Sequence, residues 1–143
     1  MPTLLLWLAI FVLCPLSTSA EYLGDLSDNK LNPNSIFNDI GPYGNLSPTS
    51  PRNPIGIYGS PVSPYSSTNP LAIDAPSLYD QEGNYRGKLS TNPLDPDSIS
   101  NPLGRYGSPL SPDSLNNPLG AGNPLDPGSP KNPYGRGWRI EGR

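Results

Sequence analysis

Few residues of this chain carry the side chains that usually perform chemistry in proteins. The chain has no histidine, which removes the commonest general base and transition-metal ligand, and its single cysteine is Cys14. The sequence offers no Ser/His/Asp set, no glycine-rich loop between a strand and a helix, and no cluster of metal-ligand residues. The residue types therefore predict a protein that is not an enzyme and that holds no cofactor.

Two acidic motifs are the remaining candidates for ion binding. Asp95-Pro96-Asp97 has the spacing that opens a calcium loop, but Ile99 and Ser100 stand where such a loop needs an oxygen ligand and a glycine. We interpret it as a turn cap, with weak calcium binding by several Asn and Asp residues as the alternative. The acidic pair Asp80/Glu82 falls on an expected hairpin loop and is interpreted as solvated.

Aromatic residues spaced among prolines offer a different chemistry, because rings on a turn scaffold can stack on glycans or cell-wall polymers. The candidate interaction surface consists of Tyr43, Tyr58, Tyr106, Tyr134 and Trp138. The alternative is that the tyrosines are the only large groups available to pack a thin core. The net charge is −3 with both signs interspersed, so the sequence predicts no nucleic-acid partner.

The N-terminus has the pattern of a secretory signal peptide. An apolar run, Leu4–Leu13, precedes a small-residue stretch that ends at Ala20, where we expect cleavage. The run is too short to span a bilayer, so we expect no transmembrane span after cleavage, and Cys14 leaves with the signal. This predicts a protein that is secreted or located in the periplasm or cell envelope.

Proline and glycine set the fold class of the rest of the chain. This part has 19 of the 21 prolines and all 15 glycines, so a helix-breaking residue interrupts nearly every window after residue 29, which excludes long helices. We expect a mainly irregular, turn-rich chain with short antiparallel strands. Ser77–Tyr79 and Tyr85–Leu89 flank a short polar loop and predict a β-hairpin at about 76–89. Tyr22–Leu26 and Gly137–Ile140 read as further strands of the same small sheet.

The chain also repeats itself on two scales. The segment that starts at Tyr22 aligns with the segment that starts at Tyr85, which indicates an internal duplication. Within each copy a shorter, roughly 15- or 16-residue unit recurs, as the series Pro96, Pro112 and Pro127 shows. The expected organisation is a signal peptide at 1–20, a first long repeat at 21–74, and a hairpin plus second long repeat at 75–143.

Large apolar residues recur regularly in the second repeat, and we expect them to line one side of a stacked coil whose units bury their faces on their neighbours. They are Leu94, Ile99, Leu103, Tyr106, Leu110, Leu115, Leu119 and Leu125. Ordering a residue costs about 1.5 kcal/mol and a buried leucine returns roughly 1.5–3 kcal/mol. The sum is close to zero, so an ordered repetitive coil and a partly flexible chain are both compatible with the sequence.

The motifs LYDQEGNYRGKLS (78–90), NPLGRYGSPLSPDSLNNPLG (101–120) and GRGWRI (135–140) resemble a set of small exported bacterial repeat proteins of unknown function. Those proteins typically have tyrosine where this chain has Leu103 and Leu119. The resemblance implies export and a repeat module, and it supplies no catalytic residues. The leading hypothesis is a non-enzymatic, envelope-associated or extracellular binding or structural module whose partner is a cell-envelope protein or polysaccharide. The alternatives are a flexible secreted spacer and a weak calcium-dependent surface module.

Overall fold

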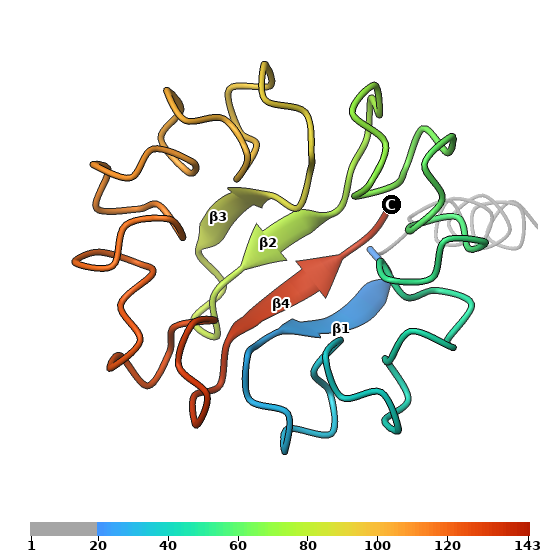
Figure 1. Ribbon diagram of the computed structural model, residues 1–143, viewed down its shortest axis with the longest axis horizontal. Helices are drawn as coiled ribbons and strands as arrows, with labels where there is room; N and C mark the ends of the chain where they lie inside the picture. The colour runs from blue at the N-terminus through green and yellow to red at the C-terminus, as the bar shows by residue number, and fades with distance from the viewer. Residues whose placement is uncertain (1–19) are drawn as a thin grey trace, which may run out of the picture.

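The computed structural model describes residues 20–143, so the expected signal peptide lies almost wholly outside the described residues. This part of the chain forms four strands: β1 (Tyr22–Leu26), β2 (Ser77–Tyr79), β3 (Tyr85–Lys88) and β4 (Trp138–Glu141). They make one antiparallel sheet in the order β1-β4-β2-β3 (Figure 1). Residues 20–143 contain no helix and consist mostly of turns, as the density of proline and glycine predicts.

The predicted hairpin is confirmed, since β2 and β3 pair directly. Asp80 organises its loop: its Oδ1 accepts hydrogen bonds from the backbone N–H groups of Glu82 and Asn84, and its Oδ2 accepts two from Arg86. Burial disfavours the charged carboxylate, but the bonds from Asn84 and Arg86 outweigh it and hold the pKa of Asp80 below its ordinary value. The interpretation of Asp80 as solvated was therefore wrong, whereas Glu82 is exposed.

The last strand joins the two halves of the chain. β4 lies between β1 and β2, where Ile140 faces Gly24 on one side and Leu78 on the other. The two outer pairings share one register, because Tyr22 lies opposite Glu141 as Tyr85 lies opposite Tyr79. The sheet thus has an approximate two-fold axis between its central strands, with β1 and β3 as equivalent edges.

The two edge strands repeat the same local contacts. Gly24 has a φ of 109°, and a Cβ placed on it would lie 2.7 Å from the Cβ of Tyr43. Gly87 has a φ of 94°, and the same distance separates its Cβ position from the Cβ of Tyr106. The aligned copies of the sequence therefore build the same glycine-over-tyrosine contact at both edges.

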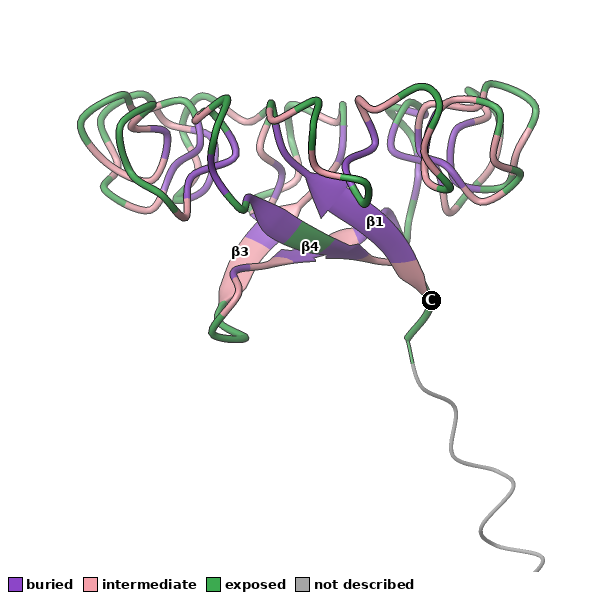
Figure 2. Ribbon diagram, turned by 90° about the horizontal axis from the view of Figure 1, so that it is seen from below, coloured by how far each residue is buried: buried purple, intermediate pink, exposed green. Residues whose placement is uncertain are grey.

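Two long segments connect the strands, and we call them the first turn array (residues 27–76) and the second turn array (residues 89–137). They surround the sheet in Figure 1 and lie in one layer on one side of it in Figure 2. In both arrays a backbone N–H donates to the carbonyl three residues earlier, and the acceptor of one turn is the donor of the turn before. In this way Ser98 donates to Asp95, Asn101 to Ser98, and Gly104 to Asn101. The arrays are therefore chains of turns that advance three residues at a time.

One step is longer. Ser108 donates its N–H to the carbonyl of Gly104, four residues earlier, at 2.9 Å. Ser60 and Gly56 form the same bond, also at 2.9 Å, in the first array. These longer steps fall within the longer of the two repeat intervals, which run from Pro96 to Pro112 and from Pro48 to Pro64. The extra residue of those intervals is therefore taken up by one wider turn.

Short polar side chains close the turns. The first residue of a turn is usually Asn, Asp, Ser or Gly. Where it is Asn, Asp or Ser, its side-chain oxygen often accepts the N–H two residues later, as Asn101 does for Leu103 at 3.0 Å. Serines at these positions line the inside of the arrays. The fully buried ones are Ser27, Ser35, Ser50, Ser66, Ser98 and Ser114. No buried side-chain nitrogen or oxygen within residues 20–143 lacks a hydrogen-bond partner, so the interior is polar and satisfied.

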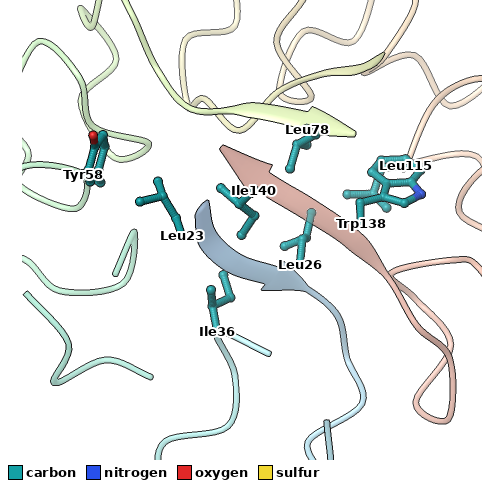
Figure 3. Close-up of a cluster of buried hydrophobic side chains, with 8 residues drawn as sticks. All are labelled: Leu23, Leu26, Ile36, Tyr58, Leu78, Leu115, Trp138 and Ile140. Carbon is teal, nitrogen blue, oxygen red and sulfur yellow. The ribbon is translucent and has the colours of Figure 1, made fainter. Parts of the chain in front are cut away.

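The apolar core is small and sits where the sheet meets the arrays. Figure 3 shows its side chains, which come from three strands and both arrays: Leu23, Leu26, Ile36, Tyr58, Leu78, Leu115, Trp138 and Ile140. Leu23, Leu78 and Ile140 are fully buried. The sheet therefore supplies most of the apolar packing, and the turns are held largely by hydrogen bonds.

The predicted apolar stack in the second array was mostly wrong. Tyr106 and Leu115 are buried and Ile99 packs against the core, but the remaining members are between 84% and 93% exposed: Leu94, Leu103, Leu110, Leu119 and Leu125. The reason is the three-residue step of the turns. Each exposed leucine occupies the third position of a turn, at its outer corner.

In five of the six short repeat units, one asparagine makes two different bonds. Asn101 accepts from Leu103 through Oδ1 and donates through Nδ2 to the carbonyl of Asp95, six residues earlier, at 3.1 Å. The same donation recurs at other turns, as from Asn117 to Ser111 and from Asn132 to Asp126. The position needs one donor and one acceptor, which explains why it holds Asn and not Asp or Ser.

Replacing Asn101 with Asp is expected to lower the free energy of unfolding by about 1–3 kcal/mol, because a carboxylate cannot donate to the Asp95 carbonyl and repels it. Asn123→Asp is the matched control, since the Nδ2 of Asn123 makes no hydrogen bond within residues 20–143, and we expect a change within about 0.5 kcal/mol. Urea unfolding at neutral pH measures both. The Asn101 effect should shrink below about pH 4, where the new carboxyl becomes a donor; equal effects at both sites would contradict this explanation.

Candidate functional site

The most prominent surface feature of the described chain is a series of exposed apolar residues at the corners of the turns, which we call the tip residues. Each is between 84% and 99% exposed. In the first array they are Leu31, Ile40, Leu46, Ile55, Val62 and Leu71; in the second they are Leu94, Leu103, Leu110, Leu119, Leu125 and Tyr134. Soluble proteins scatter single apolar residues over their surfaces, but these occupy the same position of successive turns, which makes them the candidate interaction surface.

The two copies of the sequence agree at every tip. Leu31 aligns with Leu94 and Ile40 with Leu103, and the series continues to Leu71, which aligns with Tyr134. Turn chemistry does not require this, since the residues that stabilise turns are Gly, Pro, Asn, Asp and Ser. Packing does not require it either, because the tips contact no core. Both copies therefore have apolar residues at these positions, although neither turn formation nor core packing requires them.

The backbone at the tips of the second array has few free donors. A proline precedes every tip and has no N–H, and the N–H of Leu103 is taken by Asn101 Oδ1 at 3.0 Å. The N–H of Gly104, which follows the tip, donates to the Asn101 carbonyl at 3.1 Å. The Pro-Leu corner therefore presents a proline ring and an aliphatic side chain with every local N–H already bonded.

Three of the seven charged side chains of the second array are in ion pairs, with each other or with β3. The other four, Asp97, Asp126, Lys131 and Arg136, are of both signs. Asp113 contacts Arg105 at 2.8 Å and Arg86 at 3.5 Å, and Asp95 lies 3.5 Å from Lys88. The hydrogen bond to Asp113 raises the pKa of Arg105 above its ordinary value. The array thus carries no cluster of unpaired charge of one sign.

The structure places the candidate aromatic surface differently from the sequence interpretation. Tyr58, Tyr106 and Trp138 are buried, and Tyr43 is partly buried against the core. Tyr58 also donates to a carboxylate oxygen of Glu21 at 3.0 Å, and burial together with this bond raises its pKa to about 12. Tyr43, Tyr58 and Trp138 pack in or against the core, and Tyr106 packs over Gly87 and beside Tyr85, so these rings do not form a surface. Only Tyr134 remains available, as the last tip of the second array.

The Asp95-Pro96-Asp97 motif acts as a turn cap in the structure. Asp95 Oδ1 accepts the N–H of Asp97 at 2.9 Å, and Asp97 accepts the hydroxyl hydrogen of Tyr85 at 3.1 Å. Burial, and after it this bond, raises the pKa of Tyr85 above its ordinary value. Within residues 20–143, no three or more His, Cys, Asp or Glu side chains gather in a way that could hold a metal ion.

The described residues also form two concave regions, and no tip residue lines either of them. A cavity of about 370 Å³ lies between the arrays and is lined mainly by apolar side chains, among them Leu26, Ile36, Leu89 and Ile99. A second, of about 320 Å³, separates the hairpin loop from residues 121–136 and mixes acidic and basic side chains. The described residues include no helix that is long and apolar enough to cross a membrane.

Sequence reasoning found the turns and their leucines but placed the leucines inside. The signal that could have corrected this is the spacing of Asn, Asp, Ser and Gly at every third position, which fixes which residue of each turn faces outward. Comparison with models of known protein families gives no match, and comparisons with curated proteins and with solved structures give none either.

Proposed function

We propose that this protein is a non-enzymatic, exported binding or structural module that acts at the cell envelope or outside the cell through its tip residues. The observation that carries the proposal is the agreement of the two sequence copies at the exposed tips, all of which are apolar. The exported location rests on the apolar run Leu4–Leu13 and the small residues that follow it.

The short repeated unit of the sequence is, in this proposal, the module that presents the contacts. Each unit offers apolar corners such as Leu103 and Leu110 on turns whose hydrogen bonds are satisfied internally. One corner binds weakly, but corners held on one scaffold act together and raise the total affinity. The network of turn bonds favours this module over a flexible spacer, because a spacer has no need to fix its leucines at defined corners.

The test replaces the tips of the second array with serine in the full chain. This tip-serine variant carries Leu94→Ser, Leu103→Ser, Leu110→Ser, Leu119→Ser, Leu125→Ser and Tyr134→Ser. Purified protein is mixed with isolated envelopes of the source cell and sedimented. We expect the parent protein to sediment with the envelopes. The amount of the tip-serine variant that sediments with them should be at least tenfold lower.

The matched control places methionine at the same positions, which keeps the apolar surface while changing the side-chain shape. This tip-methionine variant should sediment like the parent. Equal sedimentation of the serine and methionine variants, or no sedimentation of the parent, would contradict the proposal.

A further inference from the structure

The chemistry of the tips indicates what they bind. We propose that the tips of the second array insert into the interface of a lipid bilayer with zwitterionic headgroups. This inference rests on the proposed function and specifies its partner.

The side chains at the tips suit lipid better than the other classes of partner. All tips of the second array except Tyr134 are leucines. The residues that dominate protein–protein binding are Trp, Tyr and Arg, with Leu under-represented. A glycan surface calls for exposed rings, and Tyr58, Tyr106 and Trp138 are buried. Aliphatic side chains gain most where they enter an acyl phase, where binding grows with the apolar area removed from water.

The backbone at the corners is also prepared for an apolar phase. An N–H group with no partner is costly to move into lipid. At the Asn117–Gly120 corner Pro118 has no N–H, Leu119 donates to Asn117 Oδ1 at 3.0 Å, and Gly120 donates to the Asn117 carbonyl at 3.0 Å. The corner at Leu103 has the same bonds. Such a corner can enter the interface without losing a hydrogen bond from any of its N–H groups.

The charge of the molecule fits an uncharged surface. Figure 2 shows both arrays in one layer on one side of the sheet, and Figure 1 shows their corners pointing outward around it. Because the tips are also at least 84% exposed, a surface can reach them without any movement of the sheet. The second array carries four acidic and three basic side chains, so it has no excess of basic charge, and the net charge of the whole chain is −3. Binding therefore owes nothing to attraction by anionic lipids, which distinguishes it from a basic membrane-binding surface.

The test reads the depth of single positions in vesicles of phosphatidylcholine. In the full chain, Cys14→Ser removes the native thiol, and Leu119→Cys or Leu103→Cys carries an environment-sensitive fluorophore. The control label is at Glu82→Cys, on the exposed hairpin loop. Acyl chains brominated near the headgroup should quench a tip label at least threefold more than the hairpin label. Because the readout is local, binding by residues 1–19 cannot produce this difference.

Each outcome decides the inference. Quenching at the tips that persists when the salt concentration is raised supports the inference. In a second experiment, the chain carries one labelled cysteine and serine at the remaining tips. Its partitioning into vesicles should fall about tenfold for each leucine removed. Equal quenching at tip and hairpin, or binding that needs anionic lipid, overturns it. If the protein sediments with envelopes through its tips but leaves phosphatidylcholine vesicles unbound, the lipid inference fails while the proposed function stands. If neither occurs, both fail.

Discussion

Replacing Ile140 with alanine is expected to lower the free energy of unfolding by about 2–5 kcal/mol and to abolish cooperative unfolding at moderate temperature. Ile140 is fully buried in β4 and lies opposite both Gly24 and Leu78. The substitution therefore removes buried contacts from the strand that joins the two halves of the sheet. The turn arrays bury little apolar surface of their own and cannot compensate.

The matched control is Ile40→Ala, which removes the same atoms from a tip that is 99% exposed. Its free energy of unfolding should stay within about 0.5 kcal/mol of the parent. Urea unfolding is followed by tryptophan fluorescence in a Trp7→Phe background, so that the signal comes from Trp138, which lies in the core with Ile140. Similar losses in the two variants would mean that the sheet is not the stabilising centre of the fold.

Gly87→Ala should be nearly as damaging, with a loss of about 3 kcal/mol or more. Gly87 has a φ of 94°, where an L-residue pays roughly 1–2 kcal/mol, and its new Cβ would lie 2.7 Å from the Cβ of Tyr106 and from the carbonyl oxygen of Asp97. Backbone and a buried ring cannot move aside cheaply.

The variant Gly83→Ala separates the effect of backbone strain from that of the steric clash. Gly83 has a similar φ of 89°, but no atom lies within 4 Å of its Cβ position, so this variant should lose only the roughly 1–2 kcal/mol of backbone strain. Thermal unfolding of both variants measures the difference. Equal losses would show that Tyr106 does not pack on the β3 backbone as described.

The strands could be predicted from the sequence because their signals are local. Tyr22–Leu26, the hairpin strands and the run ending at Ile140 are short, contain β-formers and have no proline within them. The order of the strands could not be predicted. Nothing local indicates that β4 pairs with both β1 and β2, since this pairing joins residues that lie far apart in the chain.

The candidate surface was harder to predict, because exposure depends on how the turns advance. The spacing of Leu103, Leu110 and Leu119 looks like the apolar face of a stack, and only the three-residue step of the hydrogen bonds turns those leucines outward. The buried serines were missed for the opposite reason. Serine is usually a surface residue, and Ser98 is buried because its hydroxyl bonds to the Ser90 carbonyl at 3.0 Å and accepts the N–H of Ser100.

The central claim is that the tip residues serve contact with a partner and contribute little to the fold. The free energy of unfolding of the tip-serine variant tests this most directly. Because the tips are at least 84% exposed and the turns are held by backbone and Asn or Ser bonds, we expect a value within about 1 kcal/mol of the parent. A loss of several kcal/mol would contradict the claim, since it would show that these leucines pack within the folded protein.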